Sequence, residues 1–137
     1  MAKLINCFGL MMLILFSGFS QASERPQSKE EFFFEMNGET LSDGSQVYIR
    51  YDISLSYSNK LAYVKVTTWH APAPCEGNYE IKEIDGEYNL YYLGGKDACM
   101  YPSPQFNIVN KGGEMYIKGM PLIYEPGGWL KLSRKSH

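Results

Sequence analysis

The sequence predicts an all-β domain in which short antiparallel strands follow one another as a meander. Hydrophobic and polar residues alternate over long stretches, as they do in strands that bury one face. Tyrosine, valine and isoleucine are frequent in these stretches, and glycine, asparagine or proline interrupts the chain about every ten residues. The 137 residues, 45% of them hydrophobic, suffice for one compact domain.

The first 22 residues have the pattern of a signal peptide. Lys3 gives a basic start, residues 8–19 are an apolar run, and Ser20-Gln21-Ala22 offers small residues at the two positions that a signal peptidase reads. The apolar run is shorter than the roughly 20 residues that cross a bilayer, so a retained membrane anchor is the weaker alternative. We therefore expect export, cleavage after Ala22 and no membrane span in the mature chain.

Residues 23–31 are polar and contain a proline, which predicts a flexible leader before a single β domain over residues 32–135. Val47 to Tyr57 carries an apolar residue at every second position and is the clearest strand. Further strands are expected at 32–36, 61–69, 121–124 and 129–133, and two hairpins bring the total to about eight.

The two hairpins follow from their turn residues. Asp85-Gly86 suits a type I′ turn, which fixes the pairing of the strands on either side, and Gly112-Gly113 acts in the same way. The pairs that these turns predict are Tyr79 with Tyr92, Ile81 with Leu90, Glu83 with Tyr88, Ile108 with Ile117, and Lys111 with Glu114.

A meander of this size leaves two edge strands that would be free to aggregate. Closing the sheet into a small barrel of roughly eight strands removes these edges most simply, and a two-sheet sandwich is the alternative. The sequence therefore predicts a small antiparallel β-barrel.

Two cysteines remain after signal cleavage, Cys75 and Cys99, and they predict one structural disulfide. A disulfide indicates an oxidising compartment, and the sequence contains no N-glycosylation site. We expect the bacterial periplasm, with secretion as the alternative.

Composition argues against several functions. The mature chain has 12 lysines and arginines against 15 aspartates and glutamates, a net charge of −3 without a basic patch, so nucleic acid is not an expected partner. No nucleophile, base and orienting residue form a recognisable catalytic set, because His70 is isolated and Cys75 is expected to be oxidised. The cysteines and histidines lack the spacing of a metal site. We expect neither an enzyme nor a cofactor.

Two proline-bearing segments are the best candidates for a binding surface. The disulfide would hold the segment before Cys75 beside the segment after Cys99, since bridged Cα atoms lie about 4.4 to 6.8 Å apart. Proline stiffens such loops and lowers the entropy lost on binding, although proline also commonly ends strands without any function. The candidate partner-binding residues are Trp69, His70, Pro72, Pro74, Tyr101 and Pro104.

Two other functions stay open. Eleven tyrosines could line a cavity for a small ligand, although a barrel of about eight short strands is filled mostly by its own side chains. Phe32-Phe33-Phe34 places aromatic rings on both faces of a strand, which would suit a structural subunit of an envelope assembly or a homodimer contact.

In size, disulfide content and expected architecture, the chain resembles small periplasmic inhibitors of lysozyme and immunity proteins that neutralise cell-wall-degrading toxins. The resemblance implies an envelope or secreted protein as partner, with a basic cell-wall hydrolase or toxin as the target. It agrees with the weak acidity of the mature chain, because opposite charge favours association. We therefore expect an exported protein that binds and blocks another protein.

Overall fold

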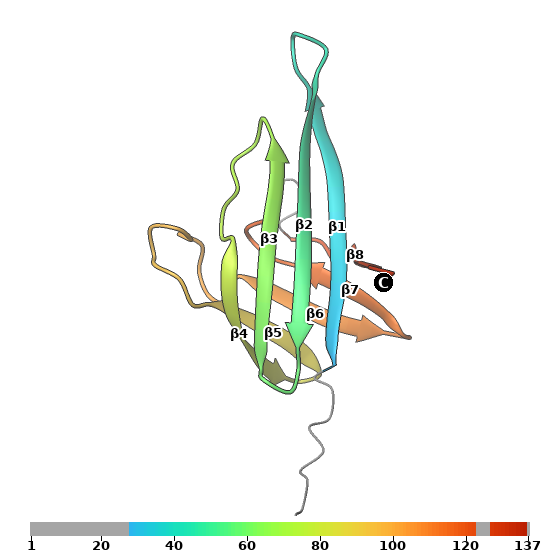
Figure 1. Cartoon of the computed structure of the whole chain (residues 1–137), viewed down its shortest axis with the longest axis vertical. Helices are drawn as coiled ribbons and strands as arrows, with labels where there is room; N and C mark the ends of the chain where they lie inside the picture. Colours follow the sequence, from blue (N-terminus) through green and yellow to red (C-terminus); the bar gives the residue numbers. More distant parts are fainter. Residues whose placement is uncertain (1–27, 123–126, 137) are drawn as a thin grey trace, which may run out of the picture.

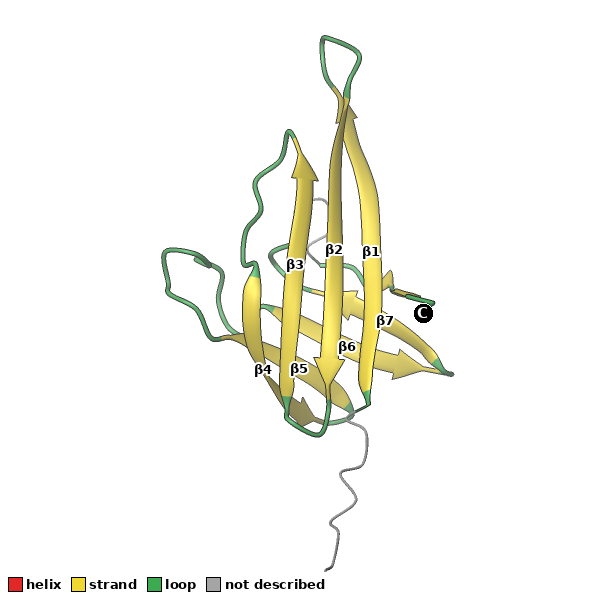
Figure 2. Cartoon of the chain, viewed as in Figure 1, coloured by secondary structure: helices red, strands yellow, loops and turns green. Residues whose placement is uncertain are grey.

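A computed structural model describes residues 28–122 and 127–136 of the chain. It is all-β, and the nine strands run in chain order around one sheet (Figures 1 and 2). Among the described residues, no helix is long and apolar enough to cross a membrane. The predicted signal peptide and most of the leader lie outside these residues. The strands are β1 (Lys29–Thr40), β2 (Gln46–Ser56), β3 (Leu61–Trp69), β4 (Gly77–Ile84), β5 (Glu87–Tyr92), β6 (Phe106–Lys111), β7 (Glu114–Lys118), β8 (Leu130–Lys131) and β9 (Ser133–Arg134).

The sheet order shows how the meander nearly closes into a barrel. The strands follow the order β8-β7-β6-β5-β4-β3-β2-β1-β9, and strands that are adjacent in this order are antiparallel. β8 and β9 are separated by Leu132 alone, so one short C-terminal segment pairs with β7 on one side and with β1 on the other. The predicted barrel is therefore confirmed, with its last strand split in two.

The predicted hairpin registers are also confirmed. Ile81 lies opposite Leu90, and Ile108 lies opposite Ile117. Asp85 and Gly86 both adopt positive φ angles of 53° and 79°, as a type I′ turn requires. Local turn chemistry thus sets the pairing of four strands.

Side chains from every long strand fill the barrel interior. The alternating residues of β2 from Val47 to Leu55 are buried, and the rings of Tyr51 and Tyr79 both contact Phe106. Two of the described tyrosines, Tyr51 and Tyr79, are thus buried in the core, where their rings pack against the ring of Phe106.

The start of the first strand and the strand expected at 121–124 differ from the sequence prediction. β1 begins at Lys29, so residues 29–31 of the expected leader belong to the strand, where they pair with β2. The strand expected at 121–124 is wrong for its first two residues: a turn follows Gly119, whose carbonyl accepts a hydrogen bond from the amide of Leu122, and proline has no amide to donate. Ile123 and Tyr124 lie outside the described residues.

The three consecutive phenylalanines pack against groups of the same chain. Phe34 is partly buried, with its ring stacked on that of Tyr51 at a centroid distance of 6.3 Å. Phe32 is buried in the core, and the guanidinium of Arg134 lies 5.0 Å from its ring centroid. The Arg50 guanidinium lies 4.2 Å from the ring centroid of Phe33 on the outer face. β9 pairs with β1 at Phe32 and Phe33. Homodimer formation stays a prediction.

The two ends of the barrel differ in their connections. In a meander, successive connections alternate between the ends, and tight turns at 57–60, 85–86 and 112–113 share one end. The β1–β2 turn and the longer connections after β3, β5 and β7 share the other, which we call the long-loop end. Binding residues commonly lie on loops that a rigid scaffold positions. The long-loop end is therefore the candidate location of a functional site.

Candidate functional site

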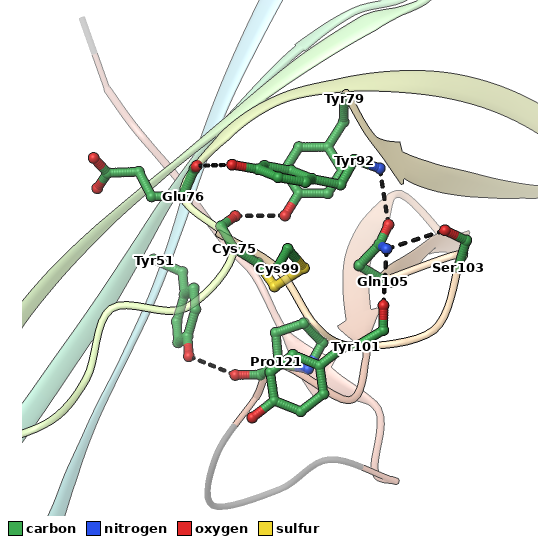
Figure 3. Close-up of a disulfide and its surroundings, with 10 residues drawn as sticks. All are labelled: Tyr51, Cys75, Glu76, Tyr79, Tyr92, Cys99, Tyr101, Ser103, Gln105 and Pro121. Carbon is green, nitrogen blue, oxygen red and sulfur yellow. Dashed lines mark hydrogen bonds between the residues drawn. A yellow bond between two sulfur atoms is a disulfide. The ribbon is translucent and has the colours of Figure 1, made fainter. Parts of the chain in front are cut away.

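A disulfide joins the two proline-bearing loops, as predicted. Cys75 and Cys99 are bonded, with their Cα atoms 4.5 Å apart, and both are buried (Figure 3). The amide of Cys75 donates a second link, a 3.2 Å hydrogen bond to the carbonyl of Ala98. The loop of residues 70–76 is thereby held against the loop of residues 93–105.

Tyrosine hydroxyls from the barrel interior hold the backbone of these loops. The hydroxyl of Tyr79 donates to the carbonyl of Cys75, and that of Tyr92 donates to the carbonyl of Glu76 at 2.9 Å (Figure 3). The Tyr51 hydroxyl, from β2, donates to the carbonyl of Pro121 at 2.9 Å. Burial, assisted by Tyr92 and Tyr51, raises the pKa of Tyr79, which keeps its hydroxyl protonated as a donor.

A buried amide organises the segment that follows Cys99. The Nε2 of Gln105 donates to the Tyr101 carbonyl at 3.1 Å and to Ser103 Oγ at 3.0 Å, while its Oε1 accepts from the Tyr92 amide at 2.8 Å (Figure 3). One side chain thus ties β5 to residues 101–103. Among the described residues, no buried side-chain nitrogen or oxygen lacks a hydrogen-bond partner.

The two bridged loops line a mainly apolar hollow of about 530 Å³ that is open to solvent. Its wall includes the proline-rich loop on one side and residues 97–101 on the other. Met100 stands at this hollow with 89% of its surface exposed, which is unusual for a large apolar side chain. The lining residues are Pro72, Ala73, Pro74, Asp97, Ala98, Met100 and Tyr101.

Trp69 and His70 form a separate aromatic pair at the end of β3. Their ring centroids lie 4.8 Å apart at an interplanar angle of 81°, and Trp69 is 59% exposed. His70 has a positive φ of 57°, so the chain turns away from the sheet at this residue. Hydrogen bonds from the hydroxyl and amide of Ser45 lower the pKa of Asp43 in the β1–β2 turn, and the electrostatic interaction of Asp43 with His70 places the aromatic pair near this turn.

The six candidate residues therefore divide into two groups. Pro72, Pro74 and Tyr101 line the hollow. Trp69, His70 and Pro104 are not among its lining residues, and Pro104 follows a cis peptide bond in the segment that Gln105 holds.

Asp97 and Met100 were missed by the sequence reasoning. Both lie within two residues of Cys99, so proximity to the disulfide is the signal that could have found them. A methionine is normally expected in the core, and nothing local in the sequence indicates that Met100 is exposed.

Four large exposed apolar side chains lie at the long-loop end. Among the described residues seven such side chains are exposed, and the other three are on the outer face of β3 or at the opposite end. The four are Trp69, Leu93, Met100 and Met120, which lie in or beside three different connections. Met100 is the one of the four that lines the hollow.

The residues around the hollow define what chemistry it offers to another molecule. The hollow is lined by proline, alanine and methionine side chains, by one phenol and by one carboxylate. The two cysteines beside it are joined in the disulfide. In the part of the chain that the structure describes, no three His, Cys, Asp or Glu side chains come together as metal ligands would. The hollow offers apolar contact and one negative charge.

No protein-family model, curated protein or solved structure matches this chain.

Proposed function

We propose that the protein is exported to the periplasm and acts by binding another protein of the envelope through its long-loop end. The observation that carries the proposal is the hollow between the disulfide-bridged loops, with the exposed side chain of Met100 at its wall. A surface already held in one conformation loses little entropy when a partner binds.

The hydrogen bonds beneath the loops support this proposal. Tyr79 and Tyr92 hold the backbone on one side of the disulfide, and Gln105 holds it on the other. These groups are partly or fully buried and their bonds are satisfied, so the loops rest on the barrel core. Apolar side chains above such a support favour a defined partner.

The charge at this end favours a basic partner. The described loops of the long-loop end carry Asp43, Glu76 and Asp97 against one lysine, Lys96. Opposite charge on the partner would increase the association rate and orient the encounter. A basic cell-wall hydrolase or toxin has this character, so we propose that binding inhibits such an enzyme, as an inhibitor or immunity protein does.

Export is tested by the intact mass of the protein recovered from a periplasmic fraction. The expected mass is that of residues 23–137 with one disulfide. A mass that includes residues 1–22 would show that the segment is retained and would contradict the proposed export.

Partner binding is tested by capture from envelope extract on the immobilised mature protein, followed by mass spectrometry and an assay of the captured hydrolase. Trp69→Ala and Tyr101→Ala are each expected to weaken capture by about tenfold or more, as truncation of aromatic contact residues does. Tyr63→Ala is the matched control, because Tyr63 is 41% exposed on the outer face of β3.

The outcomes separate three cases. Capture of a hydrolase whose activity falls on binding supports inhibition. Capture that both variants leave unchanged would show that the long-loop end is the wrong surface. Recovery of no protein, together with a small molecule that co-purifies, would replace the proposal with a ligand-binding barrel.

A further inference from the structure

We propose that the hollow between the bridged loops receives an arginine side chain of the partner protein, with Asp97 binding its guanidinium. This inference rests on the proposed function and specifies the chemistry that the partner must present. It is carried by the combination of apolar walls, an aromatic residue and one carboxylate around the same hollow.

The walls suit the aliphatic part of a long side chain. Pro72, Ala73 and Pro74 form one side, and Ala98 and Met100 contribute apolar groups on the other. The three methylenes of an arginine would lose contact with water between these groups while the charged end stays near the rim. At about 530 Å³ the hollow has room for this side chain and part of its neighbours.

Asp97 supplies the only charge among the lining residues. Its carboxylate is exposed and takes part in none of the ion pairs formed by the described residues. Asp52 and Glu114, by contrast, each have a lysine or arginine nitrogen within ion-pair distance. A carboxylate beside apolar walls that has no ion-pair partner among the described residues is available to pair with a cation from another molecule.

The shape of the lining groups favours arginine over lysine. A guanidinium is planar and weakly hydrated, stacks on aromatic rings and can bind one carboxylate through two parallel hydrogen bonds. Tyr101 provides the aromatic ring, and its carbonyl is fixed by Gln105. A lysine ammonium is compact and strongly hydrated, so it gains less from the ring and the prolines.

The test is an NMR titration of the exported protein, labelled with ¹⁵N, with N-acetyl-arginine-N-methylamide. Saturable shifts are expected at the amides of residues 96–101. The citrulline analogue has the same shape without the charge, and it should bind about tenfold more weakly, the change that loss of one charge-assisted hydrogen bond gives. The lysine analogue should also bind more weakly than arginine.

Two variants make the test specific. Asp97→Asn keeps the shape of the side chain and should weaken arginine binding by about tenfold. Asp85→Asn is the control: Asp85 is also exposed, lies in the opposite turn, and asparagine tolerates its positive φ. Binding to this control should be unchanged.

The inference and the proposed function can fail separately. Equal binding of arginine and citrulline, stronger binding of lysine, or no shifts at residues 96–101 would overturn the arginine site. A captured partner that binds the Asp97→Asn protein as tightly as the unchanged protein would overturn the site and leave the proposed function intact. Specific arginine binding without any captured protein would support the site and contradict the proposed function.

Discussion

Removing the bridge between Cys75 and Cys99 is expected to destabilise the whole domain and not the long-loop end alone. The perturbation is the double variant Cys75→Ala/Cys99→Ala, which replaces the two buried sulfurs with small apolar groups. Serine is the poorer choice, because it would bury two hydroxyls in place of the sulfurs.

The magnitude follows from the length of the loop that the bridge closes. The cysteines are 24 residues apart, and the chain-entropy relation for a loop of this length gives about 3.5 kcal/mol at 25 °C. Domains of this size are stable by about 5 to 15 kcal/mol, so the bridge supplies a large share. The variant should remain folded but unfold at a clearly lower denaturant concentration.

The assay is urea unfolding of the mature protein followed by circular dichroism. The denaturant dependence of the unfolding free energy should rise in the variant, because its unfolded chain is no longer constrained and exposes more surface. Reductant during refolding should destabilise the unchanged protein and leave the variant unaffected. If the variant loses less than about 1 kcal/mol of unfolding free energy, the bridge does not constrain the unfolded chain and the loop-length estimate is wrong.

Three further changes test the core, the barrel wall and the surface charges. Leu90→Ala should cost about 2 to 4 kcal/mol of unfolding free energy, because Leu90 is fully buried, whereas Lys82→Ala on the other face should stay within about 0.5 kcal/mol. Gly119→Ala should lower the melting temperature and cost about 1 to 3 kcal/mol, because its Cβ would lie 2.2 Å from the carbonyl oxygen of Gln105. Burial raises the pKa of Asp52, but hydrogen bonds from Arg50 and Lys135 outweigh this and lower it. Asp52 therefore stabilises the fold above its ordinary pKa of about 4, and this contribution is lost as the pH falls through the lowered value. Asp52→Asn should reduce the acid sensitivity seen in unfolding curves between neutral pH and about pH 3.

Each of these three has an outcome that would contradict it. Equal losses for Leu90→Ala and Lys82→Ala would show that the β4–β5 register is shifted by one residue. An unchanged melting temperature for Gly119→Ala would mean that the carbonyl of Gln105 moves freely. Identical acid sensitivity with and without the Asp52 carboxylate would show that its ion pairs contribute nothing to folding.

The strand pattern and its pairing were largely predictable. Alternation of apolar residues from Val47 to Leu55 identified β2, and Asp85-Gly86 set the β4–β5 register. Both signals are local, because the period of a strand and the φ angles of a turn depend on adjacent residues. The disulfide was predictable for a different reason: with Cys7 assigned to the expected signal peptide, Cys75 and Cys99 allow only one pairing.

The candidate site was predicted only in part. Loops after Trp69 and Cys99 were expected to meet, and the structure places Pro72, Pro74 and Tyr101 around one hollow. The hollow itself depends on backbone positions held by Tyr79, Tyr92 and Gln105, which lie on different strands or loops. No local sequence pattern specifies which distant carbonyl such a hydrogen bond reaches. The positions of Met100 and Asp97 beside the hollow were therefore not predictable.

The class of fold, the hairpin registers and the disulfide could be predicted from the residues alone, because each depends on neighbouring residues or on a single available pairing. How the barrel closes could not be predicted in this way, since the segment after Trp129 exchanges its partner from β7 to β1 at Leu132. Tertiary contacts also place the side chains that surround the hollow. Closure and cavity shape depend on contacts between residues far apart in the chain, and the free energy of those contacts is shared among the whole core.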